Sequence, residues 1–156
     1  MLSVLTWIES SALHNFFLNT AWAFPAAETV HFFGLIVLFG SVAIVDLRLL
    51  GIARTIPLQS VVAFIPLSLI GFSMNAVTGV LFFFADPFRY YPNIAFRLKI
   101  LAIVLAGLNA IWFKYAVYQK IMQSRELATD AKIIAGLSLL LWILVIFAGR
   151  MIPYVE

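Results

Sequence analysis

Glu28 and His31 are two residues of this 156-residue chain whose types and spacing could do chemistry inside an apolar segment. A separation of three residues puts both side chains on one face of a helix. A carboxylate beside an imidazole can hold a metal ion or pass a proton. A structural interpretation is equally open, in which Glu28 pairs with Lys99 and His31 is a hydrogen-bonded core residue.

His31 is also suited to be the axial ligand of a b-type haem. Such a haem needs an imidazole, small residues that admit the flat ring, and cations that meet its two propionates. Gly34 lies one helical turn from His31, and Asn75 belongs to a small, polar stripe in a later segment. Plain helix packing explains such small residues equally well. The residues expected to bind the cofactor are His31, Gly34, Asn75, Arg97, Lys99 and Arg150.

A metal ion such as copper is the alternative occupant of the same region. Its expected ligands are His31, His14 and Glu28. The chain has no cysteine, so thiolate metal sites, iron–sulfur clusters and disulfides are excluded. We also find no phosphate-binding glycine loop and no nucleophile elbow. The sequence thus contains no recognisable catalytic motif, and it leaves open whether the protein is an enzyme.

Membrane-spanning helices must position these residues. Hydrophobic residues make up 64% of the chain and charged residues 11%, with a mean hydropathy of +1.07, whereas soluble domains are about 25% charged. About 20 apolar residues form a helix long enough to cross the hydrocarbon core. The segments that reach this length are 25–45, 61–85, 94–118 and 132–151. The sequence therefore predicts an all-α fold, an integral membrane four-helix bundle in one transmembrane domain over 1–156.

The first segment, 1–20, is predicted to be an amphipathic helix lying at the membrane interface. It lacks a basic start and contains Glu9 and His14, so it makes a poor signal peptide. Its aromatic residues suit the headgroup region. We expect His14 to be a solvated interfacial residue. Farther along, Pro66 is expected to kink the second membrane helix.

Basic residues predict the orientation of the bundle. The first and third connections carry six of them against four on the other side, which places both termini outside. The six are Arg48, Arg54, Lys114, Lys120, Arg125 and Lys132, and the four are Arg89, Arg97, Lys99 and Arg150. The net charge of +3 is thus a topology signal at helix ends and not a sign of nucleic-acid binding.

Several motifs of the chain resemble a family of small four-helix bacterial inner-membrane proteins without an established activity. The resemblance covers about residues 22–118 and implies a bacterial inner-membrane location. More distantly, the chain is similar to membrane cytochromes b and to copper-resistance D type proteins, although the pair of histidines on different membrane helices is missing. The motifs are P-x-x-E-x-x-H (Pro25, Glu28, His31), D-L-R-L-L-G (46–51), M-N-A-V-T-G (74–79) and F-x-L-K (96–99), with Asn109.

The function expected first is that of a membrane-embedded haem b protein, which transfers electrons or senses a redox partner or gas near the outer face. The alternatives are a permease for copper or protons and a structural subunit of a membrane complex. The lipid bilayer is the expected partner under every interpretation. Four short helices enclose few sites, so we also expect a homo-oligomer or attachment to a larger membrane complex.

Overall fold

The computed structural model describes residues 2–123 and 129–155. Every regular element in these ranges is a helix, which confirms the all-α prediction. The α-helices are α1 (Leu2–Glu9), α2 (Ala12–Asn19), α3 (Ala23–Leu49), α4 (Phe64–Ala85), α5 (Pro87–Tyr90), α6 (Ile94–Phe113), α7 (Gln119–Met122) and α8 (Thr129–Met151). Two 3-10 helices, η1 (Leu58–Ala63) and η3 (Ile152–Tyr154), and one π-helix, η2 (Lys114–Tyr118), extend α4, α8 and α6.

Four of the helical segments are long and apolar enough to cross a membrane. They run over Ala23–Leu49, Leu58–Ala85, Ile94–Met122 and Thr129–Tyr154. Each contains one of the four predicted segments, so the predicted number of long apolar helices is confirmed for the described chain. Large apolar side chains face outward from them, among them Leu69, Leu140 and Phe147. Such a surface suits hydrocarbon as solvent.

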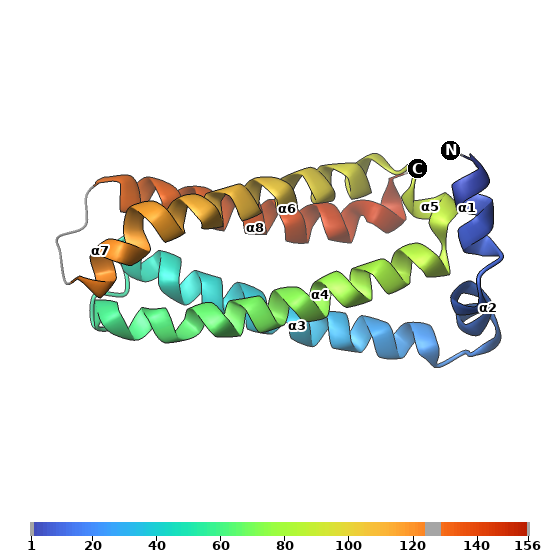
Figure 1. Ribbon diagram of the computed structural model, residues 1–156, viewed down its shortest axis with the longest axis horizontal. Helices are drawn as coiled ribbons and strands as arrows, with labels where there is room; N and C mark the ends of the chain where they lie inside the picture. The colour runs from blue at the N-terminus through green and yellow to red at the C-terminus, as the bar shows by residue number, and fades with distance from the viewer. Residues whose placement is uncertain (1, 124–128, 156) are drawn as a thin grey trace.

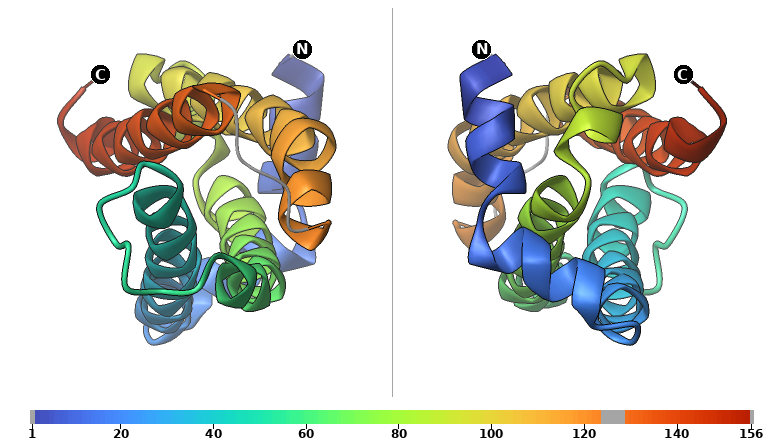
Figure 2. Two further views of the ribbon diagram at one scale, coloured as in Figure 1. Left: turned by 90° about the vertical axis from the view of Figure 1, so that its left-hand side faces the viewer. Right: turned by 90° about the vertical axis from the view of Figure 1, so that its right-hand side faces the viewer.

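The long helices form two antiparallel hairpins packed side by side (Figure 1). Helix α3 packs along α4, α6 packs along α8, and the contact of α3 with α8 joins the two pairs. Seen end-on, α8 lies diagonally across the interior from α4, and α3 diagonally from α6 (Figure 2). Both ends of the chain lie at the end of the bundle that α1, α2 and α5 cover (Figure 1).

Two glycines allow α3 and α4 to approach closely. A Cβ atom added at Gly71 would lie 2.5 Å from the backbone nitrogen of Leu38 and 2.7 Å from the carbonyl oxygen of Gly34. A Cβ atom added at Gly34 would lie 2.9 Å from the Cβ atom of Met74. Small residues are what membrane helices use to bring their backbones together. Gly34 and Gly71 therefore serve the direct contact of the two helices.

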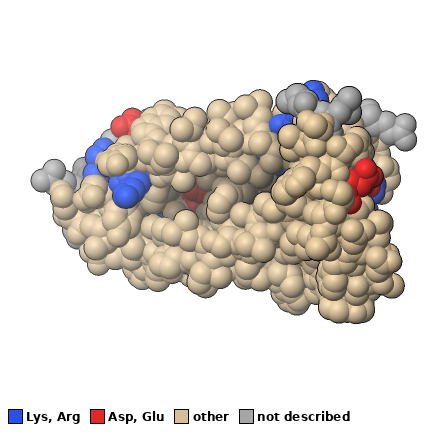
Figure 3. Space-filling model, turned by 45° about the vertical axis from the view of Figure 1, so that its right-hand side comes forward, with Lys and Arg blue, Asp and Glu red and all other residues tan. Residues whose placement is uncertain are grey.

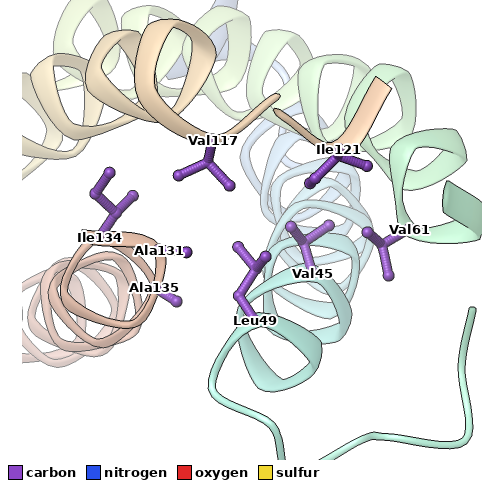
Figure 4. Packing of buried hydrophobic residues seen from close by; sticks show 8 residues of the cluster. All are labelled: Val45, Leu49, Val61, Val117, Ile121, Ala131, Ile134 and Ala135. Atoms are coloured by element: carbon purple, nitrogen blue, oxygen red, sulfur yellow. The ribbon is translucent and has the colours of Figure 1, made fainter. Parts of the chain in front are cut away.

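Buried aliphatic side chains close the opposite end of the bundle (Figure 4). The π-helix η2 joins α6 to α7, and α7 carries the third long helical segment beyond its predicted end at 118. Helix α7 then packs against η1, which brings Val117 and Ile121 into the same cluster as Val61. The full cluster is Val45, Leu49, Val61, Val117, Ile121, Ala131, Ile134 and Ala135.

Two predictions about local structure are wrong. The segment 1–20 forms two helices instead of one, because Ser11 ends the run and its hydroxyl accepts a hydrogen bond from the backbone N–H of His14 as the N-cap of α2. Pro66 does not lie in the middle of an α-helix, because the segment is a 3-10 helix up to Ala63 and α4 begins at Phe64. The proline thus lies in the first turn, where its missing N–H leaves no hydrogen bond unmade.

Candidate functional site

Two groups of polar side chains lie at different levels along the bundle axis, with the buried Ser41 of α3 between them. The first, here the His31 level, consists of His31, Asn75, Thr78 and Lys99. The second, the Asp46 level, consists of Asp46, Asn109 and Ser138. Asp46 follows His31 by 15 positions in α3, which corresponds to about 22 Å of helix rise. The levels are therefore separate sites.

His31 is joined to α4 through Thr78. The Nδ1 atom of His31 lies 2.7 Å from the hydroxyl oxygen of Thr78. That hydroxyl lies 2.7 Å from the carbonyl oxygen of Met74 and donates its proton there. The hydroxyl must then accept from His31, so the imidazole carries its proton on Nδ1. Its Nε2 atom keeps an unshared electron pair, and Phe82 packs against the ring at 5.2 Å between centroids.

Lys99 reaches toward the same level from α6. Its side chain lies over Gly149 of α8, with Nζ 3.2 Å from the place that a Cβ atom would occupy. Its charge is close enough to act on His31 across the interior. No ion pair of Lys99 with a carboxylate is found in the described ranges. The expected pairing of Glu28 with Lys99 is therefore not formed.

Glu28 is exposed and takes no part in the contact of His31 with Thr78, although Glu28 and His31 are one helical turn apart. Its side chain is exposed on the outer side of α3, in a shallow hollow with Phe32 and Phe33. At the end of the bundle it lies near Tyr90. Burial raises the pKa of the Tyr90 phenol, and among the nearby charges the carboxylates of Asp86 and Glu28 add to this rise. Glu28 thus acts at the surface, outside both polar levels.

His14 differs from the prediction of a solvated interfacial residue. It is buried between α2 and α4, and its Nδ1 atom lies 3.0 Å from the carbonyl oxygen of Phe84. Because a carbonyl can only accept, Nδ1 carries the proton. Phe84 belongs to the last turn of α4, whose carbonyls have no partner within the helix. His14 therefore caps α4 and ties the N-terminal helices to the bundle end.

The residues expected to surround a haem do not surround one space. Gly34 is in direct contact with α4. This contact leaves no space for a flat ring between α3 and α4. Asn75 donates to the carbonyl of Gly71 within its own helix. The guanidinium groups of Arg97 and Arg150 are exposed and each lies 5.7 Å from a tyrosine ring, of Tyr91 and Tyr154 respectively. These residues do not fit a haem in that position.

The expected set of metal ligands is also not assembled. His31 faces Thr78, His14 faces the end of α4, and Glu28 faces outward. Across the ranges 2–123 and 129–155, no group of three or more His, Asp or Glu side chains is placed to hold a metal ion.

Asp46 is a buried carboxylate that the sequence reasoning missed. It is 4% exposed, and its side-chain partner is Ser138 on α8. Its Oδ2 atom has no partner. Figure 3 shows a hollow along one face of the molecule, with a small acidic area deep inside it. Asp46 is thus an acid inside a helix bundle with only part of its hydrogen-bonding capacity used.

Asn109 contacts the same part of α8 from α6. Its Nδ2 atom donates to the carbonyl oxygen of Ile134 at 3.1 Å. It is 6% exposed, and its Oδ1 atom is buried without a partner. In an α-helix the Ile134 carbonyl also accepts from the backbone N–H of Ser138. Asp46 and Asn109 therefore approach one turn of α8 from two helices.

No family model, curated protein or solved structure matches this chain. The resemblance to bacterial inner-membrane proteins therefore stays a prediction.

A signal for Asp46 does exist in the sequence. The buried positions of α3 include Gly34, Leu38, Ser41, Val45 and Leu49, which recur with the helical period of 3.6 residues. Extending that period to the end of α3 puts Asp46 beside Val45 on the buried face. The predicted span 25–45 instead ends one residue before Asp46.

Proposed function

We propose that the protein carries protons across a bacterial inner membrane in which its four long helices are embedded. The observation that supports this most is the buried, partly unpaired carboxylate of Asp46. A carboxylate held away from water costs several kcal/mol unless it is paired or neutralised. Uptake of a proton neutralises Asp46, and its release restores the charge. Ionisable groups inside membrane helices are characteristic of such relays.

His31 supplies a second proton-binding group at the other level. Its Nδ1–H stays bonded to Thr78, while Nε2 holds a free electron pair. The ring can therefore take up and return a proton at Nε2 without breaking its contact with α4. With Asp46 near one end of the bundle and His31 near the other, each level faces one side of the membrane. We propose the orientation with both termini outside.

An aromatic pair between the levels argues for a carrier and not an open channel. The rings of Phe72 on α4 and Trp142 on α8 meet edge to face, with centroids 6.5 Å apart. Helices α4 and α8 are diagonal partners, so this contact joins the two hairpins, with Phe72 itself 38% exposed. Phe72 lies three residues from Asn75, and Trp142 lies four from Ser138. In the proposed mechanism this pair moves when a proton passes between the levels.

Proton flux into liposomes tests the proposal. The purified protein is reconstituted with a pH-sensitive dye inside, and a potassium gradient with valinomycin drives protons inward. We expect Asp46→Asn, which keeps the shape and removes the titrating group, to lower the flux by roughly tenfold or more, the factor that corresponds to about 1.4 kcal/mol in a barrier. Flux that is the same for Asp46→Asn and the unchanged protein would contradict the proposal.

The matched control is Asp130→Asn. Asp130 is an exposed acid in the first turn of α8, so this change removes the same charge without touching the interior. We expect its flux to equal that of the unchanged protein. An equal loss in both variants would mean that surface charge, and not the buried acid, sets the rate.

A second candidate function follows from the free Nε2 atom of His31. A histidine whose Nδ1–H is held by a partner is oriented as metal-ligating histidines are. Haem or copper bound through this atom, outside the contact of α3 with α4, would make the protein a redox carrier. A Soret band or bound copper in protein isolated in mild detergent, lost in His31→Ala, would favour this function. No such signal would leave proton transport as the better-supported proposal.

A further inference from the structure

An apolar groove, here the α2 groove, lies between α2, α3 and α4 and has a volume of about 300 Å³. Helix α2 contacts both α3 and α4 at one end of the bundle (Figure 2). The groove is lined by the aromatic residues Phe16, Phe17 and Trp22, and the ring of Phe16 meets the other two edge to face. On α3 it is lined by Ala26 and Ala27, whose short side chains leave the space between the helices unfilled.

Water is a poor ligand for the α2 groove. Thr78 has the one polar side chain among the described residues that line it. Its hydroxyl already contacts His31 and donates to the carbonyl of Met74. A buried water molecule needs about two to four polar partners, whereas a hydrocarbon chain needs none. The groove therefore fits an apolar ligand.

The α2 groove is continuous with the apolar outer surface of the long helices. Val30 of α3 and Val77 of α4 line the groove and are 44% and 62% exposed. In the membrane proposed above, these two side chains face lipid hydrocarbon. An acyl chain of a lipid can therefore enter the groove from the side without passing through water or between packed helices.

Charge distinguishes a phospholipid from a free fatty acid as the ligand. None of the described residues that line the groove is charged, and residues 1–47, which include α2 and most of α3, contain no Lys or Arg. The carboxylate of a fatty acid would meet no cation in the lining. A phospholipid keeps its headgroup in the interfacial layer, to which the exposed indole of Trp22 is suited.

We infer that the α2 groove binds one acyl chain of a membrane phospholipid. The chain packs against Thr78 and shields the contact of the Thr78 hydroxyl with His31 from water. This inference rests on the membrane location in the proposed function and goes beyond it, because proton transport by itself requires no bound lipid. The bilayer thereby becomes part of the structure around the His31 level.

Native mass spectrometry tests the inference. The full chain is reconstituted in vesicles of palmitoyl-oleoyl phosphatidylcholine and then transferred to mild detergent. We expect the unchanged protein to retain one phospholipid. Ala26→Trp and Val77→Trp each place an indole in the groove, one from α3 and one from α4, and should lower the affinity for the lipid at least tenfold, which corresponds to about 1.4 kcal/mol. Ala76→Trp, at an exposed alanine of α4 outside the lining, is the control and should retain the lipid.

A detergent molecule or a fatty acid in place of the phospholipid, or no retained molecule at all, in the unchanged protein would overturn the inference, even if a variant fails to fold. Equal retention in Ala26→Trp, Val77→Trp and Ala76→Trp would also overturn it, because the lipid would bind elsewhere. Proton flux separates the two claims. Flux lost in Asp46→Asn without a retained lipid supports proton transport and removes the lipid site, whereas a retained lipid with flux unchanged in Asp46→Asn does the reverse.

Discussion

The Nδ1 atom of His31 lies 2.7 Å from the hydroxyl oxygen of Thr78, which joins α3 to α4 at the first polar level. Because the same hydroxyl donates to the carbonyl of Met74, the contact fixes both the position and the tautomer of the imidazole. The chemistry available at Nε2 thus depends on Thr78 as much as on His31 itself.

Thr78→Val is expected to destabilise the protein. Valine keeps the shape of threonine but cannot accept, so the Nδ1–H of His31 is left without a partner, at a cost of about 1–3 kcal/mol. Equilibrium unfolding in detergent measures this change. Thr29→Val is the control, since Thr29 is exposed and its hydroxyl bonds only the carbonyl of Pro25 in its own helix. Its effect should stay within about 0.5 kcal/mol, and an equal loss in both variants would contradict the role of Thr78.

Gly71→Ala is expected to disrupt the crossing of α3 and α4. The new methyl group would lie 2.5 Å from a backbone nitrogen, and a backbone atom cannot turn aside as a flexible side chain can. Overpacking of this kind costs roughly 1–3 kcal/mol. In Gly79→Ala, by contrast, the added methyl group meets nothing within 4 Å, so stability should be unchanged or slightly raised. Equilibrium unfolding curves of Gly71→Ala and Gly79→Ala measure the two changes in the free energy of unfolding.

Hydrophobicity and length predict the four long helices well because apolar runs of this length have few other uses. The same reasoning could not place polar atoms around the helices. Glu28 and His31 share a face by spacing, yet the helix is turned so that His31 meets Thr78 and Glu28 points outward. That rotation follows from the contact of Gly34 with Gly71, a tertiary feature that no local pattern of α3 contains.

The ends of the helices were harder to predict than their centres. Asp46 reads as a surface residue because charged groups usually mark a membrane boundary. It is buried because α3 continues to Leu49 and α8 covers it through Ser138. His14 likewise reads as solvated until the end of α4, 70 residues later, supplies the carbonyl that holds it. Both depend on partners distant in sequence.

His14→Ala is expected to loosen α1 and α2 from the bundle. The change removes the donor to the Phe84 carbonyl and leaves the end of α4 uncapped, which amounts to about 0.5–1.5 kcal/mol for the lost hydrogen bond. Hydrogen–deuterium exchange should become faster over residues 2–19 while the centres of the long helices stay protected. Asn15→Ala, at an exposed position of the same helix, is the control. Unchanged exchange in His14→Ala would show that other contacts hold these helices.

Trp142→Ala is expected to raise proton flux. The indole meets Phe72 of the other hairpin at 6.5 Å between centroids, and we expect its removal to open the region between the His31 level and the Asp46 level to water. Loss of a barrier of about 1.4 kcal/mol corresponds to a roughly tenfold faster flux. Trp112→Ala, on the exposed side of α6, should leave the flux unchanged. The double variant Trp142→Ala with Asp46→Asn distinguishes proton transfer through Asp46 from a nonspecific leak through a damaged bundle. If protons still pass through Asp46, the added flux disappears in the double variant. A nonspecific leak persists in it.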